Sequence, residues 1–189
     1  MTDHVYEFPL EIIRSNRRTI SIEIKPAGIT VRAPRRMGSQ EISAFILKKK
    51  SWIEKHWHQM QERQKVCNEL GPYTTEEIKA LAEKALVVIP EKVRHYAPLV
   101  GVDYRRITIR SQRTRWGSCS GKGNLNFNCL LMLLPDDVID SVVVHELCHR
   151  KHMNHSPHFY AEVERVYPDY RRCNQWLNKN GGLYLSRLP

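Results

Sequence analysis

The chain has 189 residues, a length that fits one domain or a catalytic domain with a small annex. Its 30 lysines and arginines outnumber its 20 acidic residues, and the formal net charge of +10 favours anionic partners such as nucleotides or nucleic acid. No apolar run approaches the ~18–20 residues of a membrane span, no signal peptide begins the chain, and the five cysteines form no C-x-x-C pair, so we expect a cytoplasmic protein with reduced thiols and no membrane partner.

The first third of the chain is predicted to form strands followed by a helix. Three stretches alternate apolar and polar residues as strands do, namely residues 6–13, 18–25 and 28–33. With a turn at Pro26-Ala27-Gly28, they predict a small antiparallel sheet. Ser39 suits the cap of a helix from Gln40 to about Gln64. These elements predict an N-terminal sheet-and-helix annex over residues 1–66.

We expect residues 67–189 to form a separate catalytic domain. Gly71-Pro72 predicts an interruption between two helices. Thr74 or Thr75 is the expected N-cap of the second one, which runs to about Tyr96 and is kinked or ends at Pro90. A strand and a hairpin follow: residues 106–111 form the strand, and residues 116–120 and 124–128 form the hairpin around Gly121-Lys122-Gly123.

The most informative motif is His145-Glu146-Leu147-Cys148-His149, an H-E-x-x-H sequence typical of zinc hydrolases. On a helix, residues i and i+4 share one face, so the two imidazoles can hold one metal ion while Glu146 reaches a metal-bound water. Pro135, Asp136 and Asp137 suit the start of this helix, which we expect to run to about Lys151 or His152. Residues 138–144 are mostly apolar, and buried imidazoles require a partner such as a metal.

A third metal ligand is expected just after this helix. Ser156 and Pro157 suit the start of another helix, which places His155 at the turn between the two. We therefore predict His145, His149 and His155 as ligands of a zinc ion, with water as the fourth. Glu162 or Glu164 could replace His155, since some metallopeptidases use a glutamate ligand. Three imidazoles favour zinc over magnesium or calcium.

The densest basic segment of the chain precedes the motif. It contains Arg105, Arg106, Arg110, Arg113 and Arg115. The segment is either a solvated strand and turn or a border of the cleft, in which case Arg113 and Arg115 are the best substrate contacts. Trp116 is either a stacking face for substrate or a buried side chain.

Three further side chains have open roles. Tyr160 and Tyr167, like the arginines, are candidate donors to a developing oxyanion, and the sequence does not rank them. Cys119 is a packed thiol or a group near the cleft, and packing is favoured because no companion ligand is visible.

Several runs together resemble the YgjP-like family of bacterial metal-dependent hydrolases, which is related to the SprT and WLM zinc metallopeptidases. The runs are Arg17-Arg18-Thr19-Ile20-Ser21-Ile22, Ala33-Pro34, Trp52-Ile53, Arg115-Trp116-Gly117-Ser118-Cys119, Asn124-Leu125-Asn126, Pro135, Val143 to His149, Asn154-His155-Ser156, Phe159 and Pro168-Asp169-Tyr170. The resemblance covers roughly residues 10–178. It implies an α+β, zincin-like catalytic domain, built from a small antiparallel sheet and the active-site helix. It also implies ligands at His145, His149 and His155 and a base at Glu146.

These observations favour a zinc metallopeptidase in which Glu146 acts as general base on a zinc-activated water. Its cleft would accept an extended peptide as an added strand. One alternative is a metal-dependent phosphohydrolase or pyrophosphatase acting on anionic nucleotides, which the arginines would suit. The other is a SprT-like protease associated with nucleic acid. The partners expected are accordingly a peptide or protein, a nucleotide, or nucleic acid.

Overall fold

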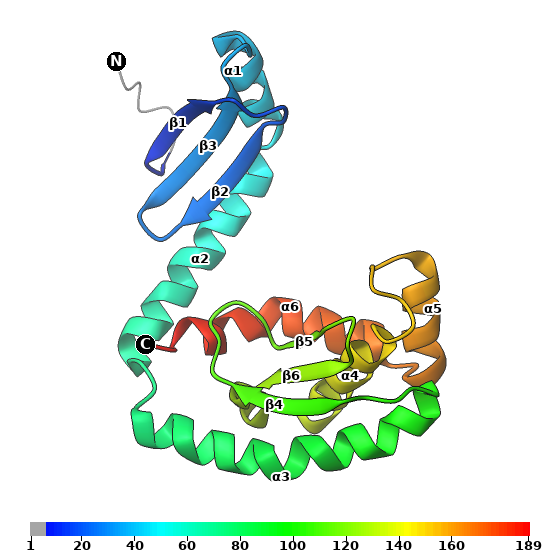
Figure 1. Ribbon diagram of the computed structural model, residues 1–189. Coiled ribbons are helices and arrows are strands. Elements are labelled where there is room, and N and C mark those ends of the chain that lie inside the picture. The colour runs from blue at the N-terminus through cyan, green and yellow to red at the C-terminus, as the bar shows by residue number, and fades with distance from the viewer. Residues whose placement is uncertain (1–6) are drawn as a thin grey trace. The chain divides into compact units, whose positions relative to one another are not determined.

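The computed structural model describes residues 7–189, so Tyr6, where the first expected strand begins, lies outside them (Figure 1). The chain divides into two compact units after Leu70, whereas the sequence analysis placed the division after residue 66. Two small sheets and six α-helices make up the described part, which confirms the α+β class. No helix in that part is long and apolar enough to cross a membrane.

The N-terminal unit contains a mixed sheet rather than the expected antiparallel one. Its strands are β1 (Leu10–Ser15), β2 (Ser21–Lys25) and β3 (Gly28–Pro34), in the order β1-β3-β2. β2 and β3 form an antiparallel hairpin, and β1 pairs with β3 in parallel. β3 is the most buried strand, with Ile29, Val31 and Ala33 inaccessible, so it takes the centre. β2 is antiparallel to β3, and β1 on the other side of β3 runs opposite to β2, so β1 is parallel to β3.

Two helices cover this sheet where a single one was expected. They are α1 (Ser39–Lys48) and α2 (Lys50–Leu70), separated at Lys49. The N-cap of α1 is Gly38, not Ser39, and its N–H donates to the Glu41 carboxylate at 2.7 Å. The unit has its own core, formed by Phe8, Ile29, Val31, Ala33, Ile42, Ile46 and Ile53.

The C-terminal unit begins with the long helix α3 (Thr75–Val100). Thr74 caps it, and the Glu77 carboxylate reaches back to the Thr74 N–H at 2.7 Å. The helix continues through Pro90, and Gly101 ends it with φ of 76°, a conformation that favours glycine. A mixed sheet follows, formed by β4 (Arg106–Arg110), β5 (Gly117–Cys119) and β6 (Asn124–Asn128) in the order β4-β6-β5.

In this second sheet the predicted β5–β6 hairpin is confirmed, but β4 pairs with β6 in parallel. The antiparallel expectation is therefore wrong for one of the two strand pairs. The reason is the same as in the first sheet. β6, which is buried at Leu125 and Phe127, is the central strand and lies between two strands that run in opposite directions. The arrangement leaves β5 at the edge of the sheet.

The H-E-x-x-H motif lies on α4 (Asp136–Cys148), after the short 3-10 helix η1 (Cys129–Leu133). α4 ends earlier than expected, with His149 as its C-cap. α5 (Pro157–Val166) begins at the predicted cap Ser156, and α6 (Tyr170–Ser186) was not anticipated. α4 contacts α3, α5, α6 and β5, which explains why Val143, Val144 and Leu147 are fully buried.

Candidate active site

Three histidine side chains converge where α4 gives way to α5. The Nε2 atom of His145 lies 3.1 Å from Nε2 of His149 and 3.2 Å from Nε2 of His155. The two α4 residues meet because they stand one helical turn apart, and His155 comes from the loop before Ser156. In the described part of the chain, this is the one group of His, Cys, Asp or Glu whose ligand atoms could share a metal ion.

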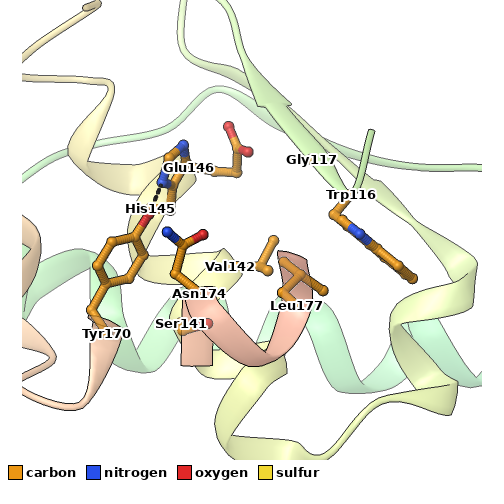
Figure 2. Close-up of a pocket in the computed structure, with 9 residues that line it drawn as sticks. All are labelled: Trp116, Gly117, Ser141, Val142, His145, Glu146, Tyr170, Asn174 and Leu177. Carbon is orange, nitrogen blue, oxygen red and sulfur yellow. Dashed lines mark hydrogen bonds between the residues drawn. The ribbon is translucent and has the colours of Figure 1, made fainter. Parts of the chain in front are cut away.

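The remaining ring nitrogens of two of these histidines are held by neighbouring groups. Nδ1 of His149 donates to the carbonyl oxygen of His152 at 2.9 Å. Because a carbonyl can only accept, Nε2 of His149 carries the lone pair. Nδ1 of His145 lies 2.9 Å from the Tyr170 hydroxyl on α6 (Figure 2). Such contacts orient metal-binding imidazoles and fix the tautomer that they use.

Burial favours the neutral form of His145 and His149. Burial, together with the nearby His149 and His155, lowers the pKa of His145 to about 3. The pKa of His149 is also lowered, mainly by burial. The Phe159 ring stacks on the His149 ring with centroids 4.5 Å apart and closes one side of the cluster. Neutral imidazoles that offer lone pairs are the form in which histidine binds metals.

The spacing of the three Nε2 atoms suits zinc. Because zinc binds imidazole nitrogen at about 2.0–2.1 Å with tetrahedral geometry, two of its nitrogen ligands stand about 3.3–3.4 Å apart. The measured separations of 3.1 and 3.2 Å are close to this value. Three imidazole nitrogens brought this close together can share one cation, so the donor set fits a resident divalent metal.

Glu146 lies beside the histidines in an apolar setting. Its side chain is on the inner side of α4, with the residue only 5 % exposed, and its Oε2 atom has no hydrogen-bond partner. Burial raises the pKa of Glu146 to about 8, and the charge of Arg115 acts in the opposite direction. A divalent cation on the adjacent histidines would also favour the ionised carboxylate.

Gly117 on the edge strand β5 makes room for Glu146. A Cβ atom added at Gly117 would lie 2.6 Å from Oε1 and 2.7 Å from Cγ of Glu146. These distances are far inside van der Waals contact, and Glu146 is enclosed, so the carboxylate would have to move. Only glycine at this position allows the strand backbone to pass directly against the carboxylate.

We therefore expect Gly117→Ala to lower kcat/KM about a hundredfold for any reaction that uses the Glu146 carboxylate, because displacing a reacting group by an ångström has effects of that order. The histidines do not contact this position, so metal content should stay unchanged. Gly121→Ala is the matched control, since a Cβ there meets nothing within 4 Å. Steady-state kinetics with metal analysis would check this; equal activity of the two variants would contradict it.

A pocket of about 180 Å³ opens next to His145 and Glu146 (Figure 2). It lies between β5, α4 and α6, and apart from His145, Glu146 and the Tyr170 hydroxyl its polar side chains are Ser141 and Asn174. The lining residues are Trp116, Gly117, Ser141, Val142, His145, Glu146, Tyr170, Asn174 and Leu177. Ser141 already donates to the Val138 carbonyl at 2.7 Å, which leaves the Asn174 amide as the polar group available to a bound molecule.

Of the three predicted substrate contacts, only one lines the pocket. Trp116 lines the pocket and also packs closely on α6, because a Cβ at Gly181 would lie 3.0 Å from its Nε1 atom. Arg115 and Arg113 are exposed and are not among the lining residues, although the charge of Arg115 reaches Glu146. Cys119 packs against the core, and burial raises the pKa of its thiol.

The glutamates considered as alternative ligands form ion pairs instead. Glu162 accepts from Lys151 at 2.7 Å and from Arg165 at 2.9 Å. Glu164 accepts from Arg171 at 2.7 Å. Neither belongs to the histidine group. His155 is therefore the residue that the structure brings to His145 and His149.

The Glu162 ion pairs have a predicted effect on stability. The Arg165 and Lys151 contacts lower the pKa of Glu162 to about 2, so the stabilisation is complete above the ordinary pKa near 4.5 and is lost as pH falls towards 2. We expect Glu162→Gln to lower the free energy of unfolding by about 1–2 kcal/mol at pH 7. Urea unfolding between pH 7 and 3 would test this, and a difference from native protein that stays constant below pH 4.5 would contradict it.

The tyrosines near the site have roles that the sequence did not rank. The Tyr167 hydroxyl donates to the Asp137 carbonyl at 3.0 Å, which ties α5 to the start of α4. Tyr160 is 37 % exposed and stacks near His155 with ring centroids 6.1 Å apart. Tyr170 and Asn174 were missed because α6 was not anticipated, although Tyr170 stands in the Pro168-Asp169-Tyr170 run.

An α+β fold that gathers three imidazole nitrogens beside a buried glutamate defines a protein of the metal-dependent hydrolase class. The sequence model of the family described as YgjP-like, metallopeptidase domain, matches this chain over residues 18–79 and 72–180. The chain belongs to this YgjP-like family. The match includes the histidine group, Glu146, Gly117 and strands β2 and β3 of the N-terminal sheet.

Two solved metallopeptidase zymogens are distantly similar in structure. The crystal structure of abylysin from Pyrococcus abyssi has a TM-score of 0.45 and 22 % identity, covering 50 % of this chain and 96 % of its own. That of jannalysin from Methanocaldococcus jannaschii has a TM-score of 0.43 and 17 % identity, with coverages of 48 % and 94 %. No curated protein matches this chain. The family assignment therefore rests on the sequence match.

Proposed function

We propose that this protein is a zinc-dependent metallopeptidase. His145, His149 and His155 would hold the ion, and Glu146 would act as general base and later as general acid. The observation that carries the proposal is the convergence of three Nε2 atoms beside the buried Glu146 carboxylate, whose Oε2 atom has no hydrogen-bond partner. The metallopeptidase-domain description of the family supports it.

Each residue of the site would have its own role in peptide hydrolysis. When bound, zinc would supply a Lewis acid and a water molecule of lowered pKa. Tyr170 and the His152 carbonyl hold two of the imidazoles in the orientation that presents Nε2. Glu146 would take a proton on its carboxylate and return it to the leaving amine. Its apolar surroundings raise its pKa and so favour the protonated form that the second transfer needs.

The edge strand and the pocket support a peptide substrate. In the described part of the chain β5 is an edge strand that pairs only with β6, and an extended peptide could add to its other edge as a further strand. Trp116, Val142 and Leu177 line the pocket beside Glu146 and suit an apolar side chain. Asn174, which points into it (Figure 2), would pair with a polar atom of the substrate.

A nucleotide phosphohydrolase is the second candidate, and the charge that Arg115 exerts on Glu146 is the observation that favours it. The pocket itself argues for the peptidase, since its walls are mainly apolar and contain no arginine or lysine. A triphosphate would need several cationic contacts there. The peptidase therefore remains the better supported function.

The two functions can be separated directly. Purified protein with one equivalent of zinc would be incubated with a library of quenched fluorescent peptides, with casein and with a panel of nucleoside triphosphates. We expect cleavage of peptides with an apolar residue next to the scissile bond, abolished by a chelator and restored by zinc. Release of pyrophosphate or phosphate without peptide cleavage would overturn the proposal in favour of the phosphohydrolase.

A further inference from the structure

A group of arginines gathers at one end of the N-terminal sheet. β1 and β3 end there and β2 begins there, because β1 is parallel and β2 antiparallel to β3. The loops at this end carry Arg17, Arg18, Arg35 and Arg36, here called the arginine cluster. The backbone N–H groups of Arg17 and Arg35 donate to the same Ser15 carbonyl, at 2.9 and 3.1 Å, so the two loops are fastened together.

No carboxylate in the described part of the chain is paired with the arginine cluster. Within residues 7–189 none of its members makes an ion pair. Arg18, Arg35 and Arg36 are exposed, and Nε of the half-buried Arg17 has no hydrogen-bond partner. The arginines of α5 and α6 differ, because Arg165, Arg171 and Arg172 all meet carboxylates. Like charges held together without acids repel, and an anionic partner would relieve this repulsion.

The start of α2 lies at the same end of the sheet. The Trp57 ring lies 6.0 Å from that of Phe8, just before β1. Nε2 of Gln61 donates to the Pro26 carbonyl in the β2–β3 turn at 3.3 Å. The middle of α2 therefore lies at the far end, and its first turn lies near the arginine cluster, as the path of the helix along the sheet illustrates (Figure 1).

That first turn adds positive charge and an aromatic surface. Lys48, Lys49 and Lys50 stand at the junction of α1 and α2, and within the described residues only Lys50 of the three makes an ion pair, with Glu54 at 3.7 Å. Trp52 is 46 % exposed, and its ring lies 4.2 Å from the His56 ring. An exposed tryptophan among cations is the combination by which proteins hold single strands: the cations contact phosphates and the aromatic ring stacks on a base.

We propose that this end of the N-terminal unit binds single-stranded nucleic acid. The arginine cluster contacts the phosphate groups, for which the forked guanidinium is suited, and Trp52 stacks on a base. This binding surface belongs to the N-terminal unit and the histidine site to the C-terminal unit, and its existence does not depend on the peptidase activity proposed above.

Fluorescence anisotropy with a labelled oligothymidylate and the full-length protein tests the proposal. We expect the triple variant Arg18→Glu, Arg35→Glu and Arg36→Glu to weaken binding at least tenfold. The slope of the logarithm of its binding constant against the logarithm of salt concentration should become smaller by about 2, at ~0.7 per lost phosphate contact. The matched control reverses the same charge on Lys65, Lys79 and Lys84, which are exposed and make no ion pair in the described part of the chain. It should weaken binding less than threefold.

Trp52→Ala should weaken oligothymidylate binding about tenfold and leave binding of a duplex of equal length unchanged. Circular dichroism and thermal unfolding would establish that every variant is folded. Three results would each overturn the proposal: no binding by the native protein at 50 mM salt, equal losses in the two triple variants, or full competition by polyglutamate, which would indicate an acidic protein partner.

Discussion

Glu146→Gln is expected to lower kcat/KM for peptide cleavage about a thousandfold, within the range that a general base contributes. The amide keeps the size of the side chain but cannot accept the proton. Because Glu146 is not one of the three converging nitrogens, metal content should remain about one ion per chain. The variant should be at least as stable as the native protein, since burial of a carboxylate whose Oε2 atom has no hydrogen-bond partner is unfavourable and a neutral amide reduces that cost.

Steady-state kinetics on the best library peptide would give this result, with metal analysis and thermal unfolding on the same preparation. Glu164→Gln is a suitable control, because that carboxylate is occupied by Arg171 at 2.7 Å and lies outside the histidine group. It should retain nearly full activity. A Glu146→Gln variant with native kcat/KM would contradict the assignment of the base.

His149→Ala is expected to abolish stoichiometric metal binding and, with it, catalysis. The substitution removes one of three Nε2 atoms and leaves two imidazoles, fewer than the protein ligands of known zinc sites. It also removes the ring that stacks on Phe159 and the hydrogen bond to the His152 carbonyl. The metal-free protein should therefore lose about 1–3 kcal/mol of its free energy of unfolding.

Metal analysis and urea unfolding in the presence of a chelator would measure the two effects separately. His158→Ala serves as the control, because His158 is exposed on α5 and contributes no atom to the histidine group. That variant should keep its metal and its stability. Retention of about one zinc per chain by His149→Ala would refute the ligand assignment.

Much of the candidate site could be predicted because its parts are local in sequence. The i, i+4 spacing of His145 and His149 needs only a helix to bring the side chains together. Ser156 and Pro157 mark the start of α5 and so fix the loop that carries His155. The choice between His155 and Glu162 needed the structure, because it depends on Lys151 and Arg165 holding the carboxylate away.

The rest depends on contacts between distant segments. Alternation predicted the strands, but the direction of β1 and β4 depends on which strand becomes central, and burial decides that. Tyr170 and Asn174 reach the site only because α6 packs against α4. The need for glycine at position 117 arises where β5 crosses Glu146, and the sequence does not show this approach.

Metal content of the native chain tests the central claim most directly. The protein would be produced without an affinity tag, purified without a metal column and analysed by mass spectrometry alongside His149→Ala and Glu146→Gln. The account predicts about one zinc per chain in the native protein and in Glu146→Gln, and close to none in His149→Ala. A folded native protein that contains no metal and takes up none when offered equimolar zinc would contradict it.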